Sequence, residues 1–159
     1  MVEGYDAFPT ELVVTVKGWN KVAELQTKNV EDSKQAFIAM WFNPQMDSAA
    51  ENGIKKAISD AGYTPVRIDQ KEHNNKIDDE IIAEIKRSKF VVADFTGHRG
   101  GVYFEAGYAM GLGKPVIWTC RKGDLENLHF DTRQYSHIVW ETEEELYKKL
   151  FNRIRASIN

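Results

Sequence analysis

The stretch FVVADFTGHRGGVYFEAG, residues 90–107, joins a short apolar run to a glycine-rich loop and the start of a helix. The continuous apolar residues 90–93 are typical of a strand that is buried on both faces of a parallel sheet. Three glycines within residues 97–101 predict a loop whose backbone can approach a ligand closely. A helix is predicted to follow and to run to about Met110. This strand–loop–helix order is typical of α/β proteins.

The same alternation of strands and helices continues on both sides of this stretch. Four more strands are predicted at 36–42, 63–68, 115–119 and 137–140, and three more helices at 50–61, 77–85 and 142–154. We therefore expect an α/β fold: a doubly wound, five-stranded parallel sheet, flavodoxin-like or Rossmann-like, with helices on both faces. In such folds, ligands bind outside the carboxyl ends of the strands.

The first 34 residues do not follow this pattern. We expect a strand at Leu12–Val16, a turn at Lys17-Gly18, a short helix at Trp19–Gln26 and a polar linker over Thr27–Gln35. The chain is thus predicted to have two parts, a small hairpin-helix appendage over 1–34 and an α/β domain over 35–159. The appendage resembles the wing of a winged-helix DNA-binding domain, but no recognition helix precedes it, so DNA binding is not expected.

The composition excludes several classes of protein. Of the 159 residues, 42% are hydrophobic and 28% are charged, which is ordinary for a globular chain, and the net charge of −3 argues against a broadly cationic nucleic-acid binder. The single cysteine, Cys120, excludes an intramolecular disulfide and a cysteine-rich zinc site. Because no apolar run is long enough to span a membrane and the N-terminus lacks a signal pattern, we expect a cytoplasmic protein without membrane contact. Neither a metal nor a cofactor is expected, since the four histidines show no paired spacing.

Glu105 is the acidic residue of the loop–helix stretch, in the first or second turn of the predicted helix. The helix dipole favours an ionised carboxylate there. A positioned carboxylate above the sheet edge suits nucleophilic attack on an anomeric carbon. The alternative is that an acidic residue in a first turn only stabilises the helix.

Residues 102–109, VYFEAGYA, followed by Gly113-Lys114-Pro115-Val116, resemble the signature of the nucleoside 2-deoxyribosyltransferase family. The strand at 37–40, the helix start Asp78-Asp79-Glu80 and the strand at 91–94 are also similar, and the resemblance covers about residues 36–140. Toll/interleukin-receptor (TIR)-like domains share this architecture and a catalytic glutamate.

The resemblance implies an enzyme that uses Glu105 as the nucleophile of a retaining double displacement at the N-glycosidic bond of a nucleoside or nucleotide. Asp94, Asp78 or Asp79 is a candidate donor of the proton to the leaving base, although each also suits a cap or a solvated charge. Asn127 lies where the family places a residue that reaches a neighbouring subunit's site, so a homo-oligomer with shared sites is implied.

Arg99 departs from the family pattern, which has an acidic residue six positions before the nucleophile. An arginine there suits a phosphate, to which it forms bidentate hydrogen bonds. We therefore expect either a nucleotide as the ligand, a 5′-monophosphate or NAD, or an Arg99 side chain that points into solvent.

The remaining candidates for substrate binding lie at predicted strand ends, in the loop and on the helix. Trp41 and Phe42 would stack on a base or else plug the sheet edge. Asp69 would contact a sugar hydroxyl or shape a turn. Tyr108 would orient the Glu105 carboxylate or pack in the core. The loop positions in this group are Thr96, Gly100 and Gly101.

Three functions remain open from the sequence. The first is cleavage or transfer at an N-glycosidic bond of a nucleoside or nucleotide through Glu105. The second is a TIR-like, NAD-hydrolysing defence effector. The third is a non-catalytic, nucleotide-sensing module that regulates a fused domain.

Overall fold

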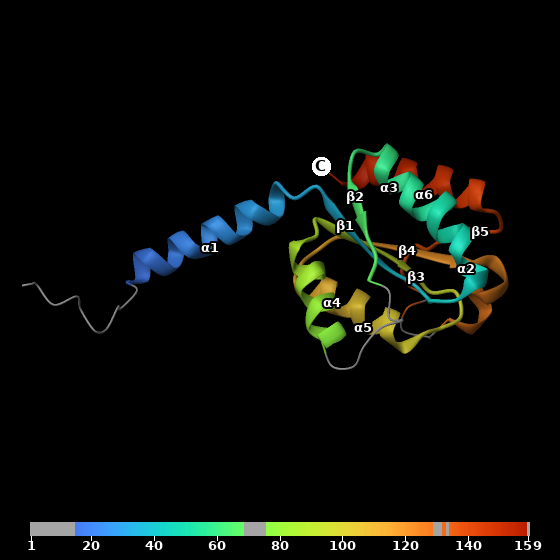
Figure 1. Ribbon diagram of the computed structural model, residues 1–159, viewed down its shortest axis with the longest axis horizontal. Helices are drawn as coiled ribbons and strands as arrows, with labels where there is room; N and C mark the ends of the chain where they lie inside the picture. Colours follow the sequence, from blue (N-terminus) through green and yellow to red (C-terminus); the bar gives the residue numbers. More distant parts are fainter. Residues whose placement is uncertain (1–14, 69–75, 129–131, 133, 159) are drawn as a thin grey trace, which may run out of the picture.

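A five-stranded, all-parallel sheet forms the centre of the protein in the computed structural model, which describes residues 15–68, 76–128, 132 and 134–158 (Figure 1). The strand order is β2-β1-β3-β4-β5, the order of a flavodoxin-like doubly wound fold. The expected fold class is therefore confirmed. The strands are β1 (Gln35–Ala39), β2 (Thr64–Val66), β3 (Phe90–Asp94), β4 (Val116–Arg121) and β5 (Ile138–Trp140).

Helices cover both faces of the sheet, as Figure 1 shows. One face carries a continuous helical segment and the C-terminal helix: α2 (Pro44–Ser48), the π-helical η1 (Ala49–Lys55), α3 (Lys56–Asp60) and α6 (Glu143–Ser157). The other face carries α4 (Lys76–Arg87) and α5 (Gly100–Gly111), and the 3₁₀ segment η2 (Lys122–Asn127) follows β4.

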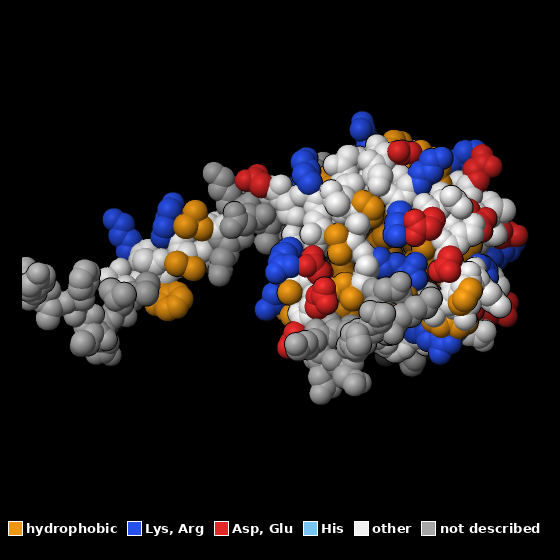
Figure 2. All heavy atoms as spheres, in the orientation of Figure 1, with side chains coloured by type: hydrophobic (Ala, Val, Ile, Leu, Met, Phe, Trp, Pro, Cys, Tyr) orange, Lys and Arg blue, Asp and Glu red, His pale blue; other side chains and the backbone are white. Residues whose placement is uncertain are grey.

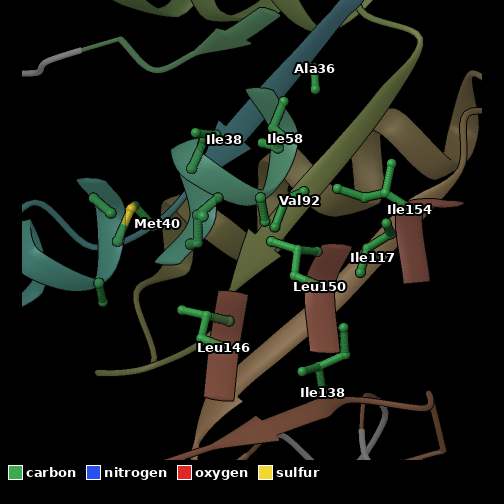
Figure 3. Close-up of a cluster of buried hydrophobic side chains, with 14 of the residues drawn as sticks. Ala36, Ile38, Met40, Ile58, Val92, Ile117, Ile138, Leu146, Leu150 and Ile154 are labelled. Atoms are coloured by element: carbon green, nitrogen blue, oxygen red, sulfur yellow. The ribbon is translucent and has the colours of Figure 1, made fainter. Parts of the chain in front are cut away.

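Two hydrophobic cores result, one on each face, because successive strand residues point to opposite sides. Ile38 and Val92 face α6, whose Leu146, Leu150 and Ile154 point toward the sheet (Figure 3). Phe37 and Val91 face the α4 and α5 side. All five residues of β3 are buried, as expected for the central strand of a parallel sheet. The apolar runs that predicted the strands are thus explained by burial on both faces.

The cap predicted for the last helix is present. The side chain of Thr142 accepts a hydrogen bond from the Glu145 amide at 3.2 Å, and the Glu145 carboxylate accepts one from the Glu141 amide at 2.9 Å. Each bond satisfies a backbone donor at the start of α6. They fix the point at which the chain turns from β5 into α6.

The N-terminal segment differs from the prediction. Val16, Lys17 and Gly18 form the start of α1 (Val16–Glu31), so the predicted turn is not formed and most of the predicted linker is helical. Lysines, Glu24 and apolar residues spaced through this stretch suit a helix, and Gly18 alone does not stop it at an end that can fray. The predicted strand residues 12–14 lie outside the described part. Figure 1 shows α1 projecting away from the sheet.

In the part of the chain that the structure describes, no helix is long and apolar enough to cross a bilayer.

Candidate functional site

A cavity of about 390 Å³ opens at the carboxyl ends of β1 and β3, where the fold predicts a ligand site. It lies between the segment that follows β1 and the start of α5. The described residues that line it are Met40, Trp41, Phe42, Arg99, Gly100, Gly101, Val102 and Glu105. Six of these eight were expected from the sequence, whereas Met40 and Val102 were not.

Glu105 brings a nearly buried carboxyl group to this cavity from the second turn of α5. It is 8% exposed, and the burial raises its pKa from 4.5 to about 7. The fold therefore favours the protonated form of Glu105 more than water does. A carboxyl group with a pKa near the working pH is suited to a chemical role.

Trp41 forms a wall of the cavity and is held in place by the glycine loop. A Cβ atom on Gly97 would lie 2.6 Å from Cε3 of Trp41, so the indole packs directly on the loop backbone. The Arg99 guanidinium carbon lies 4.3 Å from the centre of the Trp41 ring, which is a cation–π contact. The Arg99 guanidinium therefore lies against the cavity wall, while Arg99 as a whole remains exposed to solvent.

The loop itself is anchored from β4 and η2. The Thr96 hydroxyl accepts a hydrogen bond from the Arg121 amide at 3.0 Å, and Asp124 accepts one from the Gly97 amide at 3.3 Å. Thr96 is buried and does not line the cavity. Its position supports the loop. Asp124 was not singled out from the sequence, because a single acidic residue after a strand gives no signal of such a contact.

Asp94 lies at the end of β3 but is completely buried. Its two carboxylate oxygens accept hydrogen bonds from the Thr119 hydroxyl at 2.6 Å, the Trp140 indole at 2.9 Å and the Thr96 amide at 3.1 Å. Burial raises its pKa, and these hydrogen bonds partly oppose the rise. Asp94 does not line the cavity, so its contacts favour a role in joining β3, β4 and β5.

The other predicted site residues do not line the cavity, or their side chains are not described. Tyr108 lies one turn after Glu105, and its ring stacks on that of Phe104 with centroids 6.3 Å apart. Asn127 is exposed at the end of η2, and Asp79 is exposed on α4. The backbone of Asp78 belongs to α4, but its side chain and the whole of Asp69 lie outside the described part.

Phe42 also borders a second hollow of about 180 Å³, with Arg67 and Lys55 in its lining. The Arg67 guanidinium carbon lies 4.3 Å from the centre of the Phe42 ring. Lys55 pairs with Glu51 at 2.5 Å. The hollow extends the polar surface beside the cavity, and its acidic and basic groups balance one another.

Cys120 is buried, and burial raises the pKa of its thiol to about 12. A thiol with so high a pKa is unreactive at neutral pH. The described residues contain no group of His, Cys, Asp or Glu side chains arranged to hold a metal ion. Glu105 and Arg99 are therefore the ionisable residues that line the cavity in the described part.

The model of the nucleoside 2-deoxyribosyltransferase family matches residues 36–136, and the chain belongs to this family. Among solved structures, the protein is similar to the CMP N-glycosidase BcmB of Clostridium botulinum, with a TM-score of 0.60 and 20% sequence identity. That match covers 76% of this chain and 99% of the other. At 20% identity, this structural similarity supports the fold alone. A search among curated proteins found no significant match.

Proposed function

We propose that this protein cleaves or transfers at the N-glycosidic bond of a nucleotide, with Glu105 as the nucleophile. The observation that carries the proposal is a nearly buried glutamate lining a cavity at the carboxyl edge of the sheet, in a member of a glycosyl-transferring family. A CMP N-glycosidase with a similar fold supports a nucleotide as the substrate.

In the proposed reaction, a Glu105 carboxylate oxygen attacks C1′ of the sugar. The C1′–N bond breaks, its electron pair leaves with the base, and the base takes up a proton. The oxocarbenium-like transition state is cationic, so the Glu105 carboxylate is stabilised as that charge develops. Water or a second base then attacks C1′ of the glycosyl ester, which restores the carboxylate and retains the configuration.

The first turn of α5 suits the 5′-phosphate of such a substrate. Gly100 and Gly101 line the cavity, and the amides at a helix start lack intrahelical acceptors and attract anions. Arg99 adds a full positive charge beside them. Trp41 and Phe42 offer aromatic faces on which a base can stack.

The donor of the proton to the leaving base is a separate part of the proposal. Glu105 is the sole carboxylic acid among the described residues that line the cavity. A retaining glycosidase ordinarily pairs its nucleophile with a second carboxyl group about 5 Å away. We assign this role to the start of α4, to Asp78 or Asp79, because the carboxyl edge of the sheet is also where α4 begins. The contacts of Asp94 argue against that residue as the donor.

The experiment that tests the proposal measures release of the free base from nucleosides, their 5′-monophosphates and NAD. We expect release from a monophosphate to exceed release from the matching nucleoside at least about tenfold, because a hydrogen bond to a charged group contributes about 1.5–3 kcal/mol and tenfold corresponds to about 1.4 kcal/mol. Arg99→Ala should remove most of this preference and Arg99→Lys should retain part of it.

Equal release from the nucleoside and the monophosphate would refute the phosphate assignment and leave the nucleophile in place. Release of nicotinamide from NAD alone would favour the TIR-like function. Tight binding of a nucleotide without any turnover would instead indicate a sensor, and would refute the proposed enzyme.

A further inference from the structure

Arg67 is a nearly buried arginine at the carboxyl edge of the sheet, directly after β2. Its side chain retains 11% of its accessible surface, and its Nε atom is buried without a hydrogen-bond partner. Its ion-pair contact in the described part of the chain is with Asp47 at 3.8 Å, which is too long for a hydrogen bond. A buried charge is costly unless it is paired and hydrogen-bonded. Among the described residues, the guanidinium therefore lacks an acceptor for its donors.

Phe42 holds Arg67 in this position. The guanidinium carbon lies 4.3 Å from the centre of the Phe42 ring, which is a cation–π contact. Such a contact orients the planar group and leaves its N–H donors free to bind an anion from the side. Trp41 and Arg99 form a second pair with the same distance of 4.3 Å. Each of the two consecutive aromatic residues after β1 thus carries an arginine.

The hollow of about 180 Å³ that Arg67 lines also contains a second basic residue, Lys55. Asn43 adds a side-chain amide to the lining. Its oxygen accepts a hydrogen bond from the Gln45 amide at 2.9 Å, so its NH₂ group is the part that donates. Cavities that hold a whole small-molecule ligand measure roughly 300–1,000 Å³. The hollow therefore suits one polar group of a larger ligand.

The acidic residues of the hollow equal its basic residues in number but are far more exposed than Arg67. Glu51 pairs with Lys55, and its side chain retains 58% of its accessible surface. The Asp47 side chain retains 61%. Because water and salt screen exposed charges more strongly than buried ones, the buried guanidinium determines the sign of the charge that the hollow prefers. An anionic group suits it.

We propose that this hollow is a phosphate subsite, in which Arg67 binds the second phosphate of a nucleoside 5′-diphosphate. Phe42 is a wall both of the hollow and of the cavity that Glu105 lines, so one ligand occupies both. Its first phosphate lies at Arg99 and its second at Arg67, whose guanidinium fork binds two phosphate oxygens. This inference rests on the proposed function, since it assigns the substrate class of the same site.

Matched pairs of the 5′-mono- and 5′-diphosphates of adenosine, guanosine, cytidine and uridine test the subsite. Calorimetry gives the Kd of each compound, whether or not it is turned over. For the preferred base, we expect the diphosphate to bind at least about tenfold more tightly than the monophosphate, because it gains a charge-assisted bidentate contact. Equal Kd values within every pair would overturn the proposal.

Variants of Arg67 assign the preference to this residue. Arg67→Met keeps an unbranched side chain that packs on Phe42 but removes the charge, so the Kd ratio within the pair should fall below about twofold. Arg67→Lys keeps the charge without the fork and should retain part of the ratio. The matched control Arg155→Ala removes an arginine from the exposed end of α6 and should keep the whole ratio. An unchanged ratio in Arg67→Met would also overturn the proposal.

Base release from the same compounds separates this inference from the proposed function. Release from monophosphates and diphosphates with equal KM would refute the subsite and leave the role of Glu105 in place. Tight binding of a diphosphate that depends on Arg67, without release of any base, would support the subsite and refute the proposed enzyme.

Discussion

Glu105 is a carboxyl group that the fold holds largely out of water, and it takes part in no ion pair within the described part of the chain. Its pKa is raised by burial alone, which means that the folded protein favours the protonated form. A cationic sugar in the transition state would reverse that preference by supplying the missing opposite charge. In the proposed reaction, the environment of Glu105 would therefore stabilise its carboxylate best in the transition state.

This burial predicts a pH-dependent effect of Glu105→Gln on stability. Because the folded pKa of about 7 lies above the ordinary value of 4.5, the wild-type group contributes stability below about pH 4.5 and loses it as the pH rises to about 7. The variant has no such loss. In urea unfolding, its stability relative to wild type should rise by about 2 kcal/mol between pH 5 and pH 8. A difference in unfolding free energy between variant and wild type that does not change with pH would show that the fold does not raise the pKa of Glu105.

The raised pKa of Glu105 also predicts how the activity depends on pH. If the carboxylate is the nucleophile, kcat/KM should increase with pH and level off above about 7, following the ionisation of Glu105 in the free protein. Initial rates of base release from about pH 5 to pH 9 provide the measurement. A rate that falls through this interval would indicate that Glu105 acts as the acid and not as the nucleophile.

The buried hydrogen bonds that Asp94 accepts predict that its replacement destabilises the protein. Asp94→Ala leaves the Trp140 indole, the Thr119 hydroxyl and the Thr96 amide without their acceptor. Unfolding in urea should show a loss of about 3 kcal/mol or more, because buried donors are left unsatisfied. Thr119→Val, which removes one of the three donors, is the matched control and should cost about 1 kcal/mol. A loss in Asp94→Ala no larger than in Thr119→Val would contradict the structural role.

At the scale of elements, the loop between β3 and α5 has its shape set by Gly97. Gly97 has a φ of +77°, and its backbone contacts the Trp41 ring. Gly62 has a φ of +91° but open space around it. A side chain at either position would meet backbone strain, but only a side chain at Gly97 would also clash with Trp41.

Gly97→Ala should destabilise the protein by about 1–3 kcal/mol more than Gly62→Ala, because both variants incur the backbone strain and only the first displaces Trp41. It should also raise KM for the substrate, since Trp41 forms a wall of the cavity. Thermal unfolding and base-release kinetics of the two variants measure these effects. Equal destabilisation would contradict the packing of Trp41 on the loop.

The sheet and six of the eight cavity-lining positions were predictable, because the signals for them are local. Apolar runs predicted the strands, and the end of the first strand predicted Trp41 and Phe42. Glu105 was predicted from the glycine-rich loop, the helix that follows it and the resemblance of residues 102–109 to a known family. The position of Asp94 at a strand end also suggested a site, but its burial depends on Thr119 and Trp140, which are distant in sequence. The start of α1 was predicted wrongly because a β-branched run and a Lys-Gly pair outweighed the helix-forming residues that follow.

At the scale of the molecule, the two cores hold the carboxyl edge of the sheet as a rigid base for the cavity. β1 and β3 pair in register from Ala36 with Phe90 to Ala39 with Ala93, so Trp41 and the glycine loop emerge side by side. The helix α1 projects from this body, and Figure 2 shows its hydrophobic and lysine side chains exposed. The division at residue 34 into an appendage and a domain stays a prediction.

The role of Glu105 as the nucleophile is tested by measuring base release and nucleotide binding together in the variant Glu105→Gln. Gln keeps the shape of the side chain but lacks the carboxylate, so release should fall at least about a thousandfold while the Kd for the nucleotide changes less than about threefold. A variant that binds the nucleotide and retains a tenth or more of the wild-type release would contradict the assignment of Glu105 as the nucleophile.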